Sequence, residues 1–490
     1  MNKIVRIMSV AVMAVLSAQM ASASPEVTSL EMKQGPYGRL VTISYTLSEA
    51  PAVVTLDIET NCVENGTEKW ASIGGEHIWN ANGAVWKKVT AADANGEGKY
   101  TISWRPDNSW TGANGDGFVL DGVTKKARAK LTAWPIDNTP DYMVVDISEG
   151  AQSNTQKYYP AVEFLPGSVP GQKGAITNNP IYKTSMLVMR KIMAGGVTWT
   201  MGSTVREIGR ESSKESTHQV CLENNYYIGV FEVTQGQWSM LPVNRRDVSY
   251  FTNRTFRAMR PVECVGYNEI RCSPSNRVSS ADAKLHYWPG EPHPNSFLGL
   301  LRARTGIDFD LPSEAQWEFA CRAGIGDSKW NDGSDILNKT TDSNLDALGR
   351  YAKNGGTPTG ANSGVNDYPS SDCGPENGTA IVGSYKQNSW GIYDMHGNVL
   401  EWCLDWYEAD ISKIIGGKVN VDTSSPEKTS SGAVPDQNKR VFRGGSWLKN
   451  ASMLRSAARL AGKDMNNYWN AVHYMDFEKG FRLVCTAGLK

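Results

Sequence analysis

The sequence lacks the features on which several common functions depend. Its 490 residues carry a formal net charge of -1, so there is no basic excess to attract nucleic acid or an anionic membrane. No C-x-x-C pair occurs, which argues against a zinc ribbon or a thioredoxin-type site. The 6 histidines are scattered and form no H-E-x-x-H motif, so we do not expect a histidine-based catalytic metal.

Long hydrophobic runs are also missing. The apolar stretch near the N-terminus, residues 7–16, is too short to cross a bilayer. It follows Lys3 and Arg6 and precedes the small residues 21–23, which is the order of basic region, apolar region and cleavage site in a signal peptide. We therefore expect residues 1–23 to be a cleaved signal peptide of a bacterial protein. The mature chain is expected to be secreted, periplasmic or at the cell surface, without a transmembrane anchor.

The 8 cysteines all lie beyond the expected signal peptide. An even number of cysteines in an oxidising compartment favours disulfides over free catalytic thiols. Eight cysteines allow many pairings, so their spacing alone does not assign the bonds. The pairing stays open for Cys62, Cys221, Cys264, Cys272, Cys373 and Cys403.

Residues 24–150 alternate between apolar and polar side chains, as half-buried strands do. Val41 and Ile43, for example, flank the polar Thr42. Turn dipeptides of the Asn-Gly type separate such runs. We predict an all-β sandwich of immunoglobulin-like or fibronectin-like type for this region. Residues 151–185 combine several prolines with glycine, serine and asparagine, so we predict a linker or an extended strap there.

The rest of the chain has few helix signals and many loop signals. Capping-box spacing at Thr234 with Gln237 and at Ser313 with Gln316 predicts two short helices. The amphipathic segment 296–304 predicts a third. Beyond these helices the chain is rich in Gly, Asn, Asp and Trp. We expect disulfides and bound cations to hold such loops together.

Five sequence blocks and a closing tripeptide follow one another along this part of the chain. They are GGVTWTMGS (195–203), YIGVFEVTQ (227–235), LPSEAQWEFACRAG (311–324), WGIYDMHGNVLEW (390–402), RGGSW (443–447) and GFR (480–482). In this order they resemble the formylglycine-generating enzyme family, also called the sulfatase-modifying factor family, over residues 186–487. The resemblance implies a variant of the C-type lectin fold, rich in irregular loops. Together with the predicted sandwich, it gives an α+β fold class.

The resemblance implies an oxidase whose reactive centre is missing here. Active members of the family use oxygen and a copper ion, held by two cysteines after the Gly-Gly-Ser turn, to oxidise a sulfatase cysteine to formylglycine. Cu(I) is a soft ion that prefers thiolate ligands. Lys449 stands at the first cysteine position, and Met453 or Leu454 stands at the second. Trp402 and Ser446 match groove residues of the family. We therefore expect no bound copper and favour a protein without this activity.

The resemblance also implies structural calcium and one disulfide. One calcium site would be formed in the WGIYDMHGNVLEW block, mainly by backbone carbonyls and one carboxylate, which suit this hard cation. A second site would begin about 50 residues earlier in the chain. The disulfide would tie the helix of the third block to the end of the domain. The implied residues are His396, Gly397, Val399 and Glu401 for the first site, Asn344 and Leu345 for the second, and Cys321 with Cys485 for the disulfide.

Three functions stay open from the sequence. We favour a module that binds a protein, peptide or glycan, whose identity the sequence does not give. One alternative is an oxidoreductase that makes formylglycine at an atypical site, and another is a structural or assembly protein of the cell envelope. Aromatic side chains in and after the RGGSW block suit ligand contacts. These candidates are Trp447, Tyr468, Trp469 and Tyr474.

Overall fold

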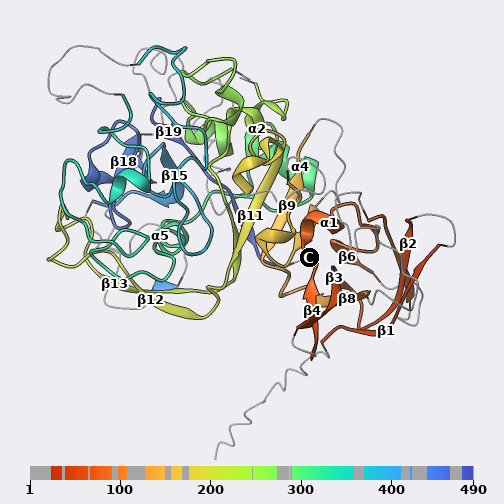
Figure 1. The fold of residues 1–490 in the computed structure, drawn as a ribbon. Helices are drawn as coiled ribbons and strands as arrows, with labels where there is room; N and C mark the ends of the chain where they lie inside the picture. Colours follow the sequence, from red (N-terminus) through yellow and green to blue (C-terminus); the bar gives the residue numbers. More distant parts are fainter. Residues whose placement is uncertain are drawn as a thin grey trace, which may run out of the picture.

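The computed structural model has many short strands, few helices and long irregular segments, in a mixed α/β arrangement. Strands β1 to β8 gather in one lobe, and most later elements form a second lobe, with β9 and β11 between them (Figure 1). None of the helices in the described part of the chain has the length and apolar character to cross a membrane. The structure describes residues 24–35, 39–64, 67–90, 98–106, 127–148, 156–167, 176–244, 247–272, 286, 290–356, 369–409, 420–421, 439–463 and 477–488.

The N-terminal lobe consists of two antiparallel sheets that share a core. In the first sheet the order is β1 (Glu26–Gln34), β2 (Val41–Ser48), β7 (Gly98–Trp104) and β5 (Asn82–Gly83). In the second the order is β4 (Thr67–Ser72), β3 (Ala52–Glu64) and β6 (Lys87–Val89), and β8 (Ala127–Pro135) also pairs with β3. Buried and partly exposed residues alternate along β2, as predicted. Both sheets contribute to one hydrophobic cluster, and the short helix α1 (Gly75–Ile78) lies beside it.

The second lobe is built on three further sheets. One five-stranded sheet has the order β10 (Gln156–Tyr159), β9 (Tyr142–Asp146), β11 (Met186–Ile192), β14 (Tyr226–Gly229) and β20 (Val484–Thr486). A three-stranded sheet contains β12 (Val197–Met201), β13 (His218–Leu222) and β16 (Asn420–Val421). A four-stranded sheet has the order β18 (Leu460–Lys463), β17 (Lys439–Arg443), β15 (Leu400–Trp406) and β19 (Lys479–Gly480).

The described parts of residues 151–185 form a strand and short turns rather than a flexible linker. Strand β10 falls within 151–185, and β9, which we placed in the sandwich, pairs with β10 and β11 instead. The polar and proline-rich residues form short turns: Asn179 accepts a hydrogen bond from the backbone N–H of Ile181 and caps a 3-10 helix that begins at Pro180. The two lobes therefore share a hydrophobic core, to which β9, β10 and β11 contribute, rather than a flexible connection.

The predicted helices are confirmed. Helix α2 (Gln235–Ser239) begins with a capping box at Thr234, and α5 (Glu314–Arg322) begins with one at Ser313. Helix α4 (Phe297–Thr305) is capped by Ser296 and ends at Gly306, whose φ of 69° lies in the left-handed region that glycine adopts easily.

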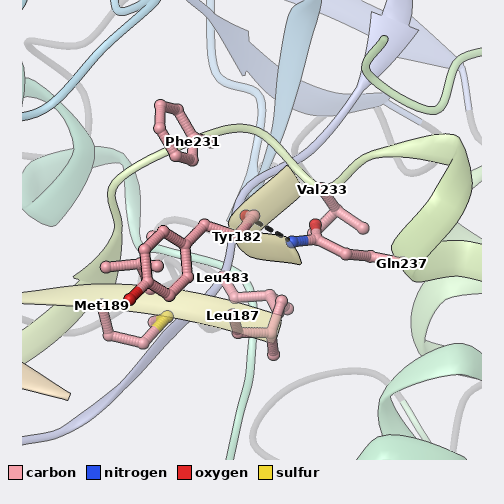
Figure 2. Close-up of a pocket in the computed structure, with 9 residues that line it drawn as sticks. Tyr182, Leu187, Met189, Phe231, Val233, Gln237 and Leu483 are labelled. Carbon is pink, nitrogen blue, oxygen red and sulfur yellow. Dashed lines mark hydrogen bonds between the residues drawn. The ribbon is translucent and has the colours of Figure 1, made fainter. Parts of the chain in front are cut away.

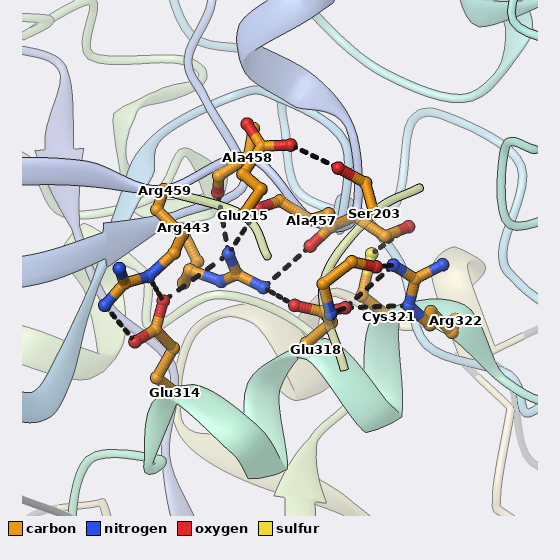
Figure 3. A network of polar contacts seen from close by, with 12 residues as sticks. Ser203, Glu215, Glu314, Glu318, Cys321, Arg322, Arg443, Ala457, Ala458 and Arg459 are labelled. Atoms are coloured by element: carbon orange, nitrogen blue, oxygen red, sulfur yellow. Dashed lines mark hydrogen bonds and ion pairs between the residues drawn. The ribbon is translucent and has the colours of Figure 1, made fainter. Parts of the chain in front are cut away.

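Buried ion pairs connect these elements. The Arg482 guanidinium makes two 2.7 Å bonds to the Glu401 carboxylate, and neither side chain is exposed to solvent. Figure 3 shows a second network, in which Glu314 and Glu318 of α5 face Arg443 and Arg459 from other segments and Arg322 from the same helix. Its pairs are Arg459 with Glu314, and Arg322 and Arg443 with Glu318. Charges inside a protein are tolerated only when they are paired in this way.

Loss of one partner from the central pair should be costly. Arg482→Met leaves the Glu401 carboxylate buried without its cation, so we expect a loss of about 3–5 kcal/mol in the free energy of unfolding. Urea unfolding followed by far-UV circular dichroism measures this loss. The matched control is Lys329→Met, which breaks the exposed Lys329–Asp335 pair and should cost at most about 1 kcal/mol. Equal effects of the two variants would contradict the role given to Arg482.

Candidate functional site

The groove residues implied by the resemblance, Trp402 and Ser446, are both buried. Trp402 on β15 is 1% exposed, and its indole N–H donates a 2.9 Å hydrogen bond to the carbonyl of Val265. Its ring centroid lies 4.0 Å from that of Phe442. Ser446 is 0% exposed. Trp402 is thus a core residue here, and neither side chain is open to a substrate.

A carboxylate joins Ser446 to the first lost cysteine position. The Ser446 hydroxyl lies 2.5 Å from Oε2 of Glu478. The ammonium group of Lys449 lies 2.9 Å from the same oxygen and 3.1 Å from Oε1. The Lys449 side chain is 32% exposed and that of Glu478 is 16% exposed, so this ion pair lies at the protein surface. A cation and its counter-ion therefore occupy the place of the first copper ligand.

Both candidates for the second cysteine position implied by the resemblance, Met453 and Leu454, take part in apolar packing. Leu454 ends the 3-10 helix η7 (Ala451–Leu454) and is 0% exposed. A Cβ added at Gly397 would lie 2.8 Å from Cδ2 of Leu454, and one added at Gly445 would lie 2.7 Å from Cδ1. Two glycines thus make room for the leucine side chain. Met453 packs at the edge of the same cluster and is only partly buried.

The predicted ligand contact at Trp447 was wrong. Trp447 is 0% exposed, and its indole N–H donates a hydrogen bond of 3.1 Å to the carbonyl of Phe477. Its ring packs against those of Phe251 and Phe477. A large aromatic side chain this deeply buried stabilises the fold rather than contacting a ligand. The other three candidates, Tyr468, Trp469 and Tyr474, lie outside the described residues.

The predicted carboxylate ligand of calcium is already neutralised. Both oxygens of Glu401 accept hydrogen bonds from Arg482, and Oε2 also accepts one of 2.6 Å from the indole N–H of Trp317. A guanidinium at this distance repels a divalent cation. Within the described ranges, no group of three or more His, Cys, Asp or Glu side chains has a geometry that could hold a metal.

The other predicted calcium ligands of the first site are also engaged. The His396 carbonyl packs against Gly349, where a Cβ would lie 1.5 Å from its oxygen. The backbone N–H of Gly397 donates to the carbonyl of Gly444, and that of Val399 donates to the Glu232 carboxylate. The contacts of Gly397 and Val399 involve N–H groups, whereas calcium binds oxygen atoms, so calcium at this site stays a prediction.

The second predicted calcium segment forms a turn. The Leu345 carbonyl accepts hydrogen bonds from the backbone N–H groups of Leu348 and Gly349. The Asn344 side chain donates to the carbonyl of Asp335. Both residues therefore serve the local backbone in this structure.

The predicted Cys321–Cys485 disulfide is absent. The Cys321 sulfur lies 3.4 Å from the hydroxyl of Ser456, and burial raises the pKa of its thiol to about 12. Side chains alternate along β20, so Val484 points into the cluster around Cys321 while Cys485 belongs to the core on the other face. Strand register thus keeps the two sulfurs apart.

A small apolar pocket lies away from these residues. Figure 2 shows Tyr182, Leu187, Met189, Phe231 and Val233 around it, with the Gln237 side chain donating to the carbonyl of Tyr182. Its free space is about 10 Å³, roughly what one water molecule needs. The pocket has no room for an organic ligand.

The comparisons with known proteins agree with the arrangement of the sequence blocks. Residues 183–487 match the family model described as "Sulfatase-modifying factor enzyme 1-like domain", which covers more than half of the chain. The chain belongs to the sulfatase-modifying factor family. The matched range begins close to the predicted start at residue 186. The substituted cysteine positions therefore lie inside a genuine family domain.

Relatives with similar sequences include proteins named as an enzyme, a kinase and a chaperone. The chain is 31% identical over 154 residues to a formylglycine-generating enzyme of Thermomonospora curvata, covering 30% of this chain and 43% of that one. It is 29% identical over 242 residues to the serine/threonine-protein kinase pkn1 of Chlamydia pneumoniae, covering 46% and 32%. It is 30% identical over 241 residues to the chaperone protein LppX of Paenibacillus barcinonensis, covering 45% and 80%. The chain thus spans about a third of the kinase and under half of the enzyme.

Two solved structures are similar to the family domain of this chain. Treponema denticola variable protein 1 gives a TM-score of 0.39 at 23% identity, covering 61% of this chain and 95% of that one. PvdO from Pseudomonas aeruginosa gives a TM-score of 0.40 at 21% identity, covering 61% and 94%.

Sequence reasoning missed two residues of this site. Glu478 stands just before the GFR tripeptide, and its role as partner of Lys449 and Ser446 appears only in the fold. Arg455 follows η7 and binds Glu207 and Glu215 of the segment between β12 and β13. The sequence did offer one signal for Arg455, because this arginine lies in a segment rich in small and apolar residues. Such a segment is expected to be buried, and a buried charge requires a partner of opposite charge.

Leu454 should be essential for packing. Leu454→Ala removes a side chain that fills the space above two glycines, so we expect a loss of about 2–5 kcal/mol in the free energy of unfolding. Met453→Ala, at the partly exposed neighbouring position, is the matched control and should cost less than half as much. Chemical denaturation measures both values. A Leu454 variant as stable as the wild-type protein would contradict the packing account.

Glu207 should make stability depend on pH near neutrality. Burial, together with a hydrogen bond to Asp327, raises the pKa of Glu207 from 4.5 to about 7. The positive charge of Arg455 opposes this rise but does not cancel it. The other charged groups nearby are Glu215 and Arg322. The folded state then binds more protons than the unfolded state between these values, so its stability falls as pH rises from about 4.5 to 7. Glu207→Gln should reduce this fall by about 1–3 kcal/mol.

The measurement is the difference in unfolding free energy between wild type and Glu207→Gln at several pH values from 5 to 8. Parallel curves for the two proteins would show that Glu207 is not the titrating group.

Proposed function

We propose that this chain is a secreted member of the sulfatase-modifying factor family that does not oxidise sulfatase cysteines and instead acts as a binding module. One observation carries the proposal. At the two positions that hold copper ligands in active members, Lys449 is paired with Glu478 and Leu454 is buried between glycines. Neither side chain offers a thiolate, and Cu(I) binding depends on such soft ligands.

The cysteine next to the groove does not replace the lost ligands. Cys403 follows Trp402 on β15 and is 0% exposed. Burial raises the pKa of its thiol well above the ordinary value. The thiol therefore stays protonated near neutral pH, whereas metal binding and nucleophilic attack both require the thiolate.

Binding of a protein or peptide is supported by the surface beside η7. The loops at 203–210 and 336–340 both contact Ser452. A Cβ added at Gly209 would lie 2.7 Å from the Cβ of Ser452, and the backbone N–H of Ser452 donates to the carbonyl of Lys339. These loops expose apolar side chains, which in soluble proteins often mark interaction sites. They are Val205 at 85%, Ile208 at 42% and Leu337 at 53% exposure.

The relatives' names are compatible with such a role. LppX, of which this chain covers 80%, is named a chaperone, and pkn1 is named a kinase rather than a formylglycine-generating enzyme. The N-terminal sheets would then hold the binding domain away from the cell surface. Their immunoglobulin-like character, the secreted location and structural calcium remain parts of this proposal.

Incubation with a sulfatase-derived Cys-x-Pro-x-Arg peptide, oxygen and copper tests the proposal. We expect no aldehyde product by mass spectrometry, because no pair of thiolates stands at 449 and 454. An active formylglycine-generating enzyme serves as the positive control for peptide and copper. Formation of the aldehyde by the wild-type chain, and its loss on copper chelation, would overturn the non-oxidising assignment.

A further inference from the structure

Three cysteines with described side chains are partly exposed to solvent. They are Cys221, Cys264 and Cys373, whereas Cys272, Cys321, Cys403 and Cys485 are buried. Solvent access matters because thiol–disulfide exchange requires contact between a thiolate and an external disulfide. Among the described cysteines, these three are therefore the most accessible to an external disulfide.

Two of the three pack on one aromatic cluster. Cys264 and Cys373 both contact the cluster formed by Phe251, Trp447 and Phe477, although they are far apart in the sequence. Cys221 instead lies on β13 in the three-stranded sheet and is not part of this cluster. The fold thus brings Cys264 and Cys373 to the same small region.

Hydrogen bonds hold the two cysteine-bearing segments against a common segment, residues 250–253. Glu263 precedes Cys264 in the sequence. Its carboxylate accepts hydrogen bonds of 2.9 and 3.0 Å from the backbone N–H groups of Tyr250 and Phe251. On the other side, the Asn253 side chain donates a 3.0 Å bond to the carbonyl of Asp372, which precedes Cys373. A further backbone bond of 2.8 Å joins residues 252 and 371.

The backbone at Cys264 is unusual. Its φ of 60° lies in the left-handed region, which residues other than glycine rarely adopt. Such strain persists only where the surroundings fix the conformation, and it gathers at functional positions. The sulfur of Cys373 lies 3.3 Å from the carbonyl of Asn377 and 3.8 Å from a guanidinium nitrogen of Arg260. The backbone of Cys264 and the side chain of Cys373 are therefore each held in a defined conformation.

We propose that Cys264 and Cys373 form a disulfide when the folded protein meets a small-molecule disulfide oxidant. One thiolate attacks the oxidant's sulfur–sulfur bond, forms a mixed disulfide and releases one thiol of the oxidant. The second thiolate then attacks the mixed disulfide, forms the Cys264–Cys373 bond and releases the other thiol. The protein loses two protons and two electrons, and the oxidant is reduced to two thiols.

This bond would clamp the cluster that covers Trp447. Segments 250–253, 260–264 and 369–373 surround the aromatic side chain that follows the Gly-Gly-Ser turn. The disulfide would thus replace, in another place, the staple that the family resemblance implied between Cys321 and Cys485. The inference relies on the proposed secreted location for its occurrence in the cell, but not on the absence of oxidase activity.

Peptide mapping of the full chain tests the proposal. The protein, first reduced with dithiothreitol and desalted while folded, is incubated with oxidised glutathione, and remaining thiols are alkylated after unfolding in acid. We expect a linked pair of peptides containing Cys264 and Cys373 and the loss of two alkylatable thiols. The single variants Cys264→Ser and Cys373→Ser should each lose the linked pair, while Cys221→Ser, the matched control, should retain it.

Two results would overturn the proposal. One is a wild-type protein in which Cys264 and Cys373 are both alkylated, or both carry glutathione, after prolonged oxidation. The other is a linkage of either residue to a different cysteine. Because the map uses the wild-type chain, it gives an answer even where a variant fails to fold. It is also independent of the aldehyde assay, so failure of either proposal is recognised separately.

Discussion

Buried arginine side chains are the constraint on which the family domain depends. Long irregular segments cannot satisfy their own backbone carbonyls as helices and sheets do, yet buried carbonyls must be hydrogen-bonded. Arg482 donates to the carbonyls of Gly229 and Tyr393 while it pairs with Glu401. Arg443 does the same for Ala457 and Ala458. Each guanidinium thus donates to backbone carbonyls that would be paired with backbone N–H groups in a helix or a sheet.

The carboxylates in the helices complete this arrangement. Glu314 and Glu318 stand one turn apart on α5, and their position neutralises arginines that arrive from β17 and from the segment after η7. A short helix with precise capping therefore organises a large loop region. We expected disulfides and cations in this role. In the described residues of the domain ion pairs contribute to it and Cys321 and Cys485 are separate, while bound cations stay a prediction.

The positions that the resemblance assigns to the copper ligands carry side chains with well-matched neighbours. The turn that carries Ser446 is intact, and the glycines at 397 and 445 still leave space beside it. That space is occupied by Leu454, and Lys449 has an acidic partner in Glu478. A substitution without compensating changes would leave a cavity or an unpaired charge at the substituted position. Here both positions have compensating neighbours, which is expected of a domain maintained for a purpose other than copper chemistry.

Local features were predictable from the sequence, and long-range partners were not. The caps at Thr234 and Ser313 depend on residues three positions away, and the alternation in β2 depends on neighbours. Arg482 and Glu401, in contrast, are 81 positions apart, and nothing local pairs them. The disulfide failed for a related reason. Which face of β20 carries Cys485 depends on the register with β14, a tertiary property.

The distribution of prolines and polar residues was also ambiguous. Residues 151–185 have the composition of a linker, but Asn179 and Pro180 start a 3-10 helix whose Tyr182 is buried. Strand β9 looked like part of the sandwich because its own pattern does not reveal which strand it pairs with. The alternating pattern therefore indicated the N-terminal lobe, but not that β9 and β10 belong to the sheet of β11.

The central claim is that the positions of the copper ligands have been rebuilt as an ion pair and a packed leucine. An anaerobic titration of the reduced protein with Cu(I), in competition with a colorimetric chelator, tests it most directly. The account predicts that the wild-type chain removes no copper from the chelator at these positions, so Lys449→Ala and Leu454→Met leave the titration curve unchanged. Stoichiometric uptake of one Cu(I) by the wild-type chain, lost in either variant, would contradict it.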